Sequence, residues 1–271
     1  MRFASGNYYY KKSHRKYHRN QMWSWVRSRG GEDQVDRKII DIHAHILPGV
    51  DDGSRTMEES CRLLEKAYEQ GVRAIIATPH SHHTHGREYM EQLITQLSGK
   101  TKKNTPDLQL YLGQEIMYSE SVAEQLQKGQ LWPMAGSRYV LLEFLPAVSY
   151  RTLFRGIRQM RDAGYLPVLA HMERYSCLRQ KENLLDLSGS GCVLQMNYDS
   201  LQGSSLNPNI RWCRKRVQAG EVQVLASDMH RMDYRPPELR AAFRWLEDHV
   251  EEALIKAMTD TNPAGIIGHL Q

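Results

Sequence analysis

The sequence predicts an α/β protein whose parallel strands close into a TIM-like (β/α)7 barrel. Seven short, almost continuously apolar runs alternate with longer amphipathic stretches, as strands buried on both faces alternate with covering helices. Histidine and acidic residues stand at the ends of six of these runs, and no glycine-rich dinucleotide-binding fingerprint follows the first. The crossovers between such parallel strands should be right-handed, and seven repeats favour closure into a barrel over an open doubly wound sheet.

Each predicted strand is a short apolar run bounded by polar or turn-forming residues. Because the runs lack an apolar–polar alternation, we expect both faces of the sheet to be covered. In chain order the predicted strands are Lys38–Ile42, Arg73–Thr78, Leu108–Gly113, Tyr139–Glu143, Leu166–Ala170, Cys192–Met196 and Val222–Ala226.

The helices are predicted from apolar spacing and from the signals at their ends. Thr56 and Glu59 form a capping-box pattern that begins the first helix. Gly71, Gly164 and Gly220 stand where helix ends favour a positive φ. The predicted helices are Thr56–Gln70, Glu88–Lys102, Ser121–Lys128, Tyr150–Ala163, Gln180–Ser188, Asn209–Ala219 and Pro237–Met258.

The basic charge of the chain is concentrated near its N-terminus. Of 271 residues, the first 38 carry ten Lys/Arg and three Asp/Glu, so the remainder has a net charge of −2 although the whole chain has +5. We predict a disordered basic leader, residues 1–38, before one domain, residues 39–271. The leader's charge and aromatic residues also suit an anionic membrane or nucleic acid, but we expect no nucleic-acid partner.

Neither a membrane span nor cysteine chemistry is predicted. No run of about 18 apolar residues occurs, and the basic N-terminus lacks the apolar core of a signal peptide, so we expect a soluble, cytoplasmic protein. None of the four cysteines belongs to a C-x-x-C pair or has an arginine six positions later. We expect buried, inert thiols rather than a zinc knuckle or a cysteine-based phosphatase. The cysteines are Cys61, Cys177, Cys192 and Cys213.

Residues with candidate chemistry follow the predicted strands. In a (β/α) barrel the carboxyl ends of all strands meet on one face, which carries the catalytic site. A carboxylate inside an apolar strand, such as Glu143, must be paired or bound to a cation. The residues at these ends are His43 and His45 after the first strand, His80 after the second, Glu115 after the third, Glu143 ending the fourth, His171 after the fifth, and Asp228 and His230 after the seventh.

Together these residues predict a metal centre. Five histidines and four carboxylates would converge on this face. One of the four carboxylates belongs to the segment Asp51-Asp52-Gly53, which by itself indicates a turn. Mixed nitrogen and oxygen ligands suit Mn²⁺, Fe²⁺ or Zn²⁺, and nine ligands suit two or three ions rather than one. Ions about 3.5–4 Å apart clamp a phosphoryl group, so the sequence predicts a metal-dependent phosphoesterase.

Two arginines are candidates for binding the substrate phosphate. Arg174 lies three residues after His171, and Arg235 lies five residues after His230, so both follow strand ends that carry predicted ligands. The planar guanidinium group binds phosphate through two parallel hydrogen bonds. A surface ion pair is the alternative role for each.

At these positions the chain resembles a known family. The segment from Asp41 to Gly53 resembles the opening motif of the polymerase-and-histidinol-phosphatase (PHP) superfamily. It is more similar still to that of the bacterial manganese-dependent tyrosine-protein phosphatases of Gram-positive capsule and exopolysaccharide operons. The resemblance covers residues 39–263. Further motifs follow in the same order, namely Ala77-Thr78-Pro79-His80, Gly113-Gln114-Glu115-Ile116, Leu142-Glu143-Phe144, Ala170-His171-Met172-Glu173-Arg174-Tyr175 and Ala226-Ser227-Asp228-Met229-His230.

The resemblance implies a PHP-type distorted barrel with a trinuclear centre, manganese being the expected metal. It implies a hydrolase acting on phosphotyrosine, with the tail of a tyrosine autokinase as the usual substrate and peripheral membrane proximity through that kinase. Arg174 and Arg235 would lie at the substrate phosphate. The basic leader lies outside the family pattern, and a solvated loop is expected for His82, His83 and His85. The implied metal ligands are His43, His45, Asp52, His80, Glu115, Glu143, His171, Asp228 and His230.

Three other functions stay open on the sequence. The first is a histidinol phosphatase or another PHP phosphoesterase. The second is an amidohydrolase, which also begins with H-x-H but commonly bridges its metals through a lysine on the fourth strand, where this chain has Glu143. The third is a non-catalytic kinase-binding module, against which the intact set of charged residues argues, since unpaired buried charges are costly.

Overall fold

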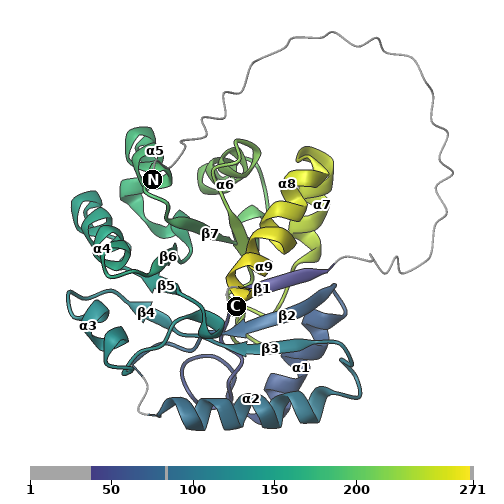
Figure 1. Ribbon diagram of the computed structural model, residues 1–271. Helices are drawn as coiled ribbons and strands as arrows, with labels where there is room; N and C mark the ends of the chain where they lie inside the picture. The colour runs from purple at the N-terminus through teal and green to yellow at the C-terminus, as the bar shows by residue number, and fades with distance from the viewer. Residues whose placement is uncertain (1–37, 83–84, 269–271) are drawn as a thin grey trace, which may run out of the picture. The chain divides into compact units, whose positions relative to one another are not determined.

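The computed structural model describes residues 38–82 and 85–268. Except for Lys38, the predicted leader lies outside the described residues, as does His83. In the described part the strands lie at the centre with helices outside them (Figure 1), and every strand pair is parallel. The strands are β1 (Ile39–Ala44), β2 (Val72–Ala77), β3 (Gln109–Leu112), β4 (Glu115–Met117), β5 (Tyr139–Glu143), β6 (Leu166–Leu169), β7 (Val193–Asn197) and β8 (Val224–Ala226).

The third predicted strand is broken in two, and this break is the barrel's main distortion. Its first half, β3, pairs with β2, and its second half, β4, pairs with β5. Gly113 lies between the halves, and a Cβ at this position would lie 3.2 Å from the Met134 Cα atom. A glycine is therefore needed for the backbone to pack this closely at the break. A bridge between His80 and Glu115 continues the pairing, and Glu115 begins β4 instead of following the third strand.

The barrel closes between β1 and the segment after β8. The Asp228 N–H donates to the His43 carbonyl at 2.9 Å, and the His45 N–H donates to the Met229 carbonyl at 2.8 Å. These bonds extend β1 two residues beyond its predicted end, so His43 lies inside the strand rather than after it. The distorted barrel predicted from the sequence is confirmed.

Two apolar clusters stabilise this arrangement. One fills the barrel with alternate strand residues such as Ile42, Ile76 and Leu141, all fully buried, and Ile266 of the last helix joins it. The other lies between the strands and the surrounding helices. Because alternate strand residues enter the two clusters, the sheet is covered on both faces, as its apolar runs predict.

The helices agree with the predicted ones to within two residues, except at the C-terminus. There the predicted helix Pro237–Met258 is wrong: Val250 and Glu251 have extended backbone, and a π-helical turn, Ala257–Thr261, follows. No described helix is long and apolar enough to cross a membrane. The helices are α1 (Met57–Tyr68), α2 (Arg87–Thr101), α3 (Val122–Gln127), α4 (Tyr150–Asp162), α5 (Lys181–Gly189), α6 (Pro208–Gln218), α7 (Arg240–His249), α8 (Glu252–Lys256) and α9 (Asn262–Ile267).

Candidate metal centre

The carboxyl ends of the strands bring all nine predicted ligands into one continuous cluster. Each histidine of the set has a ring nitrogen within 4.0 Å of a carboxylate oxygen of another predicted ligand, and each carboxylate has an oxygen within 4.0 Å of a histidine nitrogen. Three groups have ligand atoms close enough to share an ion: His45, Asp52, His80 and His230; His43, His45 and Glu115; and His80, Glu115 and Glu143.

Glu115 lies at the centre of this cluster. Its Oε1 is 2.9 Å from His171 Nε2 and 3.3 Å from His43 Nε2, and its Oε2 is 3.3 Å from His45 Nε2 and 3.1 Å from His80 Nδ1. Burial alone would raise the pKa of this carboxyl, but the imidazoles around it hold the pKa well below its usual range. A buried carboxylate whose two oxygens face different histidines has the geometry of a ligand shared between ions.

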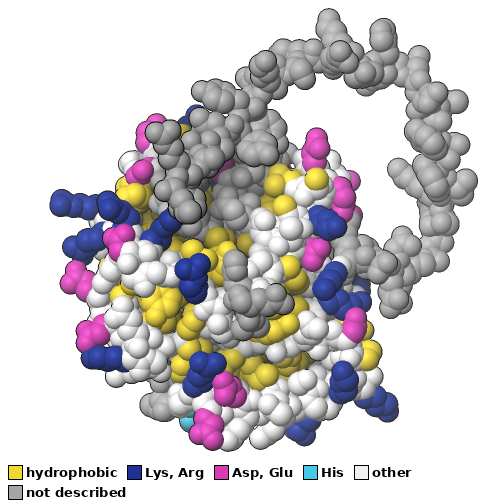
Figure 2. Space-filling model, in the orientation of Figure 1, with side chains coloured by type: hydrophobic (Ala, Val, Ile, Leu, Met, Phe, Trp, Pro, Cys, Tyr) yellow, Lys and Arg dark blue, Asp and Glu magenta, His cyan; other side chains and the backbone are white. Residues whose placement is uncertain are grey.

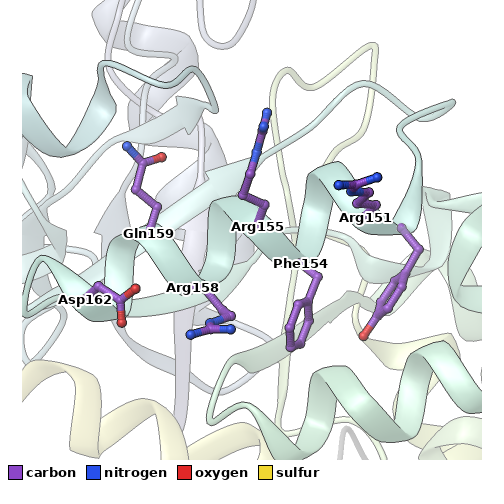
Figure 3. Close-up of a pocket in the computed structure, with 7 residues that line it drawn as sticks. Arg151, Phe154, Arg155, Arg158, Gln159 and Asp162 are labelled. Carbon is purple, nitrogen blue, oxygen red and sulfur yellow. The ribbon is translucent and has the colours of Figure 1, made fainter.

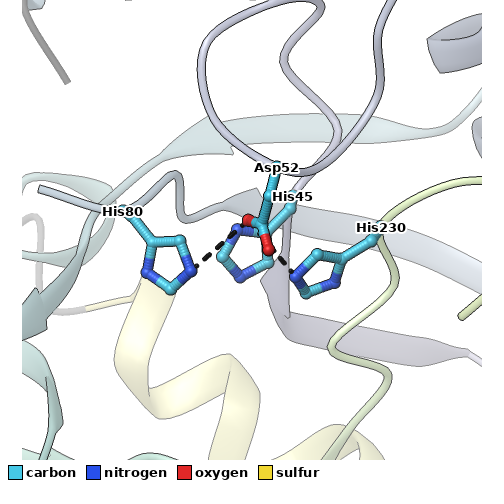
Figure 4. Close-up of side chains that lie close together, drawn as sticks. All are labelled: His45, Asp52, His80 and His230. Atoms are coloured by element: carbon cyan, nitrogen blue, oxygen red, sulfur yellow. Dashed lines mark ion pairs between the residues drawn. The ribbon is translucent and has the colours of Figure 1, made fainter. Parts of the chain in front are cut away.

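The Asp51-Asp52-Gly53 turn separates two functions. Asp52 is the exposed member, with Oδ1 3.5 Å from His80 Nε2 and 3.7 Å from His230 Nε2, and it lies between these rings in Figure 4. Asp51 is buried and accepts hydrogen bonds from the His45 ring and the His80 N–H. Asp51 therefore orients a predicted ligand, and Asp52 faces the site.

Gln195 fixes the tautomer of His43. Its Oε1 accepts from the His171 N–H at 2.8 Å, a group that can only donate, so this atom is the amide oxygen. The same oxygen lies 3.2 Å from His43 Nδ1. Because an amide oxygen cannot donate, Nδ1 carries the proton and Nε2 presents its lone pair to the cluster.

Two other histidines are held in the same tautomer. His45 Nδ1 lies 2.8 Å from the Asp51 carboxylate, and His230 Nδ1 lies 2.8 Å from the Asp228 carbonyl, both of which accept. Hydrogen bonds to Asp51 and Glu115 outweigh the effect of burial and raise the pKa of His45, whereas burial and the neighbouring His45 lower the pKa of His230 to about 4.

This arrangement fits divalent cations. His43 Nε2 and His45 Nε2 face each other at 3.3 Å, and both rings are fully buried. Without metal, the raised pKa of His45 places a proton on its Nε2, which donates to the His43 Nε2 lone pair, and a divalent cation near both nitrogens would replace that proton. Metal-ligating histidines usually donate their second ring nitrogen to a carboxylate or carbonyl, the pattern seen at three histidines here. The donors are all nitrogen and oxygen, as Mn²⁺, Fe²⁺ and Zn²⁺ accept.

Both predicted phosphate-binding arginines contact one carboxylate oxygen. Arg174 Nη2 donates to Asp228 Oδ2 at 2.6 Å, and Arg235 Nη1 donates to it at 3.2 Å. The Asn197 side chain, at the end of β7, donates to the same oxygen at 2.9 Å. Asp228 Oδ1 instead faces His43 Nε2 at 3.4 Å. Burial would raise the pKa of Asp228, but the neighbouring histidines and Arg174 hold it below its usual range.

Backbone strain is concentrated at the site. Four non-glycine residues among those described have a positive φ, and three of them are predicted site residues: His171 at 32°, Asp228 at 52° and Arg235 at 53°. Such conformations cost about 1–3 kcal/mol each and persist where the surroundings impose them. The strain places these side chains at the mouth directly after their strands end.

Sequence reasoning missed the supporting residues. Gln195 lies in β7, the predicted strand for which the sequence offered no ligand. A polar glutamine within an otherwise apolar run was the sequence signal that could have identified it as a supporting residue. Asp41 accepts from the N–H and hydroxyl of Ser227 and from the His43 N–H, where the pairing of β1 with β2 is irregular. Such irregularities redirect side chains, which explains how His43 enters the site.

Residues outside the predicted ligand set behave as loop or core side chains. His82 stacks on His80 at 5.1 Å, and His85 stacks on Tyr89 at 4.5 Å. All four cysteines are free, but only two are buried, which corrects part of the prediction. Burial raises the pKa of Cys192 and Cys213 to about 12, so neither forms a thiolate near neutral pH.

The family model for capsular polysaccharide synthesis, CpsB/CapC, matches residues 39–268. The chain belongs to this family. It is 34% identical to the tyrosine-protein phosphatase CpsB of Streptococcus pneumoniae over 240 residues, which cover 84% of this chain and 98% of the relative. It is 32% identical to the tyrosine-protein phosphatase YwqE of Bacillus subtilis, covering 82% and 89%.

A solved structure supports the same assignment. It comes from a study of YwqE and CpsB, described as unique metal-dependent tyrosine phosphatases, and matches this CpsB/CapC-family chain with a TM-score of 0.77 and 28% identity. The match covers 86% of this chain and 96% of that one. The family predicted from the sequence motifs is therefore confirmed.

Proposed function

We propose that the chain is a metal-dependent protein-tyrosine phosphatase, a hydrolase that removes phosphate from phosphotyrosine in a protein serving capsule or exopolysaccharide synthesis. The observation that carries this proposal is the contact of Arg174 and Arg235 with a carboxylate of the histidine cluster. Guanidinium groups beside a metal-type donor set are arranged for a phosphate ester. The family and the names of its relatives agree with this chemistry.

The ligand set is part of the proposal. Divalent cations, with Mn²⁺ first and Fe²⁺ or Zn²⁺ as alternatives, would withdraw charge from the phosphoryl oxygens. Two or three ions suit the number of donors, which exceeds what one ion can use. We assign them to His43, His45, Asp52, His80, Glu115, Glu143, His171, Asp228 and His230.

The chain's own residues would position the substrate and exclude competing chemistry. Arg174 and Arg235 are about one-third exposed, so both can turn from Asp228 to the oxygens of an incoming phosphate. Positioned guanidinium groups stabilise charge that grows in the transition state. No cysteine belongs to the described cluster, so we propose that water attacks phosphorus directly. The bond from phosphorus to the water oxygen would form as the bond to the tyrosine oxygen breaks, and the proton released by water would balance the proton taken up by the leaving tyrosine.

The physiological substrate is a finer part of the proposal. We propose the phosphorylated tail of a tyrosine autokinase, a partner implied by the sequence resemblance, which would bring the phosphatase close to the membrane. The cytoplasmic compartment stays a prediction, as does the leader–domain division at residue 38.

Activity after controlled metal removal tests the proposal. The full chain is treated with chelator, then assayed with a phosphotyrosine peptide after adding Mn²⁺, Fe²⁺ or Zn²⁺ separately. We expect no turnover in the chelated protein and recovery with at least one ion. Histidinol phosphate and a cyclic amide, assayed in parallel, represent the rival phosphoesterase and amidohydrolase functions. Full activity after exhaustive chelation, or faster hydrolysis of either rival substrate, would contradict the proposal.

A further inference from the structure

Helix α4 carries an unusual concentration of positive charge. Its thirteen residues include four arginines and one aspartate, whereas residues 39–271 as a whole are weakly acidic. Arg151, Arg155 and Arg158 are exposed and recur at intervals of four and three residues, so they are spread over the outer face of the helix. In Figure 2, Lys and Arg side chains gather at the edge where Figure 1 places α4.

A shallow groove of about 660 Å³ lies along this outer face, and every residue that lines it belongs to α4. In Figure 3, Arg155 and Gln159 extend from one side of α4, and Phe154 and Arg158 extend from the other. Phe154 is partly buried and packs against Tyr150, with ring centroids 5.6 Å apart. The groove therefore combines guanidinium groups with an apolar floor.

The arginines of the groove are only partly neutralised. Arg155 pairs with Glu120 at 2.8 Å. Arg151 and Arg158 form no ion pair or hydrogen bond with another described residue. Asp162, at the far end, is the single carboxylate among the residues that line the groove. An anionic ligand would therefore find two available cations beside an aromatic surface.

The groove begins close to the barrel mouth. Glu143, in the candidate metal centre, ends β5, and α4 begins at Tyr150 after a short loop in which Leu145 is 69% exposed. In a parallel barrel the first turn of each helix lies on the side where the strands end. From Arg151 to Asp162 the helix rises about 16 Å, which is the length of about five residues of extended chain.

We propose that the outer face of α4 binds an acidic peptide segment of the protein whose phosphotyrosine enters the barrel mouth. This inference rests on the proposed phosphatase function. The width of a single helix and the partly buried ring in the groove favour one extended peptide chain. A basic helix can also bind anionic lipid, so membrane binding is one of the outcomes of the test below.

Peptide kinetics test this inference. Wild-type chain is compared with Arg151→Gln/Arg158→Gln and with a control on another helix, Arg211→Gln/Lys215→Gln. The control residues are also exposed, and they lie four residues apart where the α4 pair lies seven apart. The substrates are phosphotyrosine peptides with five acidic or five neutral residues on either side. Para-nitrophenyl phosphate serves as a substrate with no flank.

We expect an acidic flank to lower KM for the wild type and the α6 control by about five-fold at low salt, the scale of two exposed ion pairs. The α4 variant should lose this preference, whereas kcat/KM for para-nitrophenyl phosphate should not change. An undiminished preference in the α4 variant would overturn the inference. Loss of binding to phosphatidylglycerol vesicles with unaltered peptide kinetics would overturn it as well and assign the groove to membranes.

A binding measurement separates failure of the inference from failure of the proposed function. A fluorescent, unphosphorylated acidic peptide is titrated against the same three proteins. If no phosphotyrosine substrate is hydrolysed with any metal, the phosphatase proposal fails. Peptide binding that is weaker only in the α4 variant would still support the groove. Equal binding by all three proteins would refute it.

Discussion

Replacing Gln195 tests whether β7 controls the metal centre without contributing a ligand. Gln195 is fully buried and joins two predicted ligands: its oxygen accepts from the His171 N–H and, in the assigned tautomer, from His43 Nδ1. Its side-chain nitrogen donates to Asn197 Oδ1 at 2.8 Å, and Asn197 in turn donates to Asp228. Gln195→Leu keeps a similar volume and removes all three hydrogen bonds.

The structure sets the expected magnitude. Leucine would leave three buried polar groups without a partner, and each such group costs about 1–3 kcal/mol. We therefore expect the free energy of unfolding of the metal-free protein to fall by at least about 3 kcal/mol. Loss of the partner that holds a metal-ligating histidine weakens metal binding by about 10- to 100-fold, and we expect an effect of this size.

A matched variant separates these two effects. Gln223 also accepts from a backbone N–H of β7, that of Leu194 at 2.9 Å, but it precedes β8 and lies at the opposite end of the strands from the metal centre. Gln223→Leu should lower stability and leave metal affinity unchanged. Gln195→Glu retains an acceptor for His43 and should recover metal affinity better than leucine does.

The assays are denaturant unfolding of the chelated proteins and competitive metal titration against a chromophoric chelator. Metal affinity of Gln195→Leu within two-fold of wild type would refute the reasoning, because His43 would then need no partner to present its Nε2 lone pair. A loss of affinity in Gln223→Leu equal to that in Gln195→Leu would refute it too, since general destabilisation would explain both.

Three further predictions follow from the site. Gly53→Ala places a Cβ 2.2 Å from the His45 carbonyl oxygen, so it should reduce the free energy of unfolding by about 1–3 kcal/mol and lower metal affinity. Gly99→Ala, whose Cβ meets no atom within 4 Å, should change neither quantity. Denaturant unfolding and metal titration measure the two effects. Arg174→Ala should lower kcat by about 100-fold or more with metal content unchanged, and retained kcat would remove it from the phosphate site. In metal-free protein, hydrogen bonds to carboxylates outweigh burial and raise the pKa of His171 to about 9, above its unfolded value of about 6.5. The stability that protonated His171 contributes is therefore complete below pH 6.5 and is lost as pH rises through 9. The free energy of unfolding should fall by up to about 3 kcal/mol over this range, and unfolding measured at several pH values should detect the fall. Bound metal should abolish it.

The sequence by itself determined the barrel and predicted the members of the site. Apolar runs without alternation specify strands buried on both faces, and the carboxyl ends of parallel strands must meet, so residues as distant as His43 and His230 could be assigned to one centre from their places after strands. The order of the motifs then identified the family, and the match of the CpsB/CapC family model to residues 39–268 confirms it.

Tertiary structure alone decided how these residues are held. A tautomer depends on a hydrogen-bond partner that the sequence does not place nearby, and Gln195 lies 152 positions from His43. The division of labour between Asp51 and Asp52 depends on which carboxylate the turn buries. The break of the third strand at Gly113 depends on close packing against another segment. Local patterns fix which residues reach the mouth, whereas their orientation comes from long-range contacts.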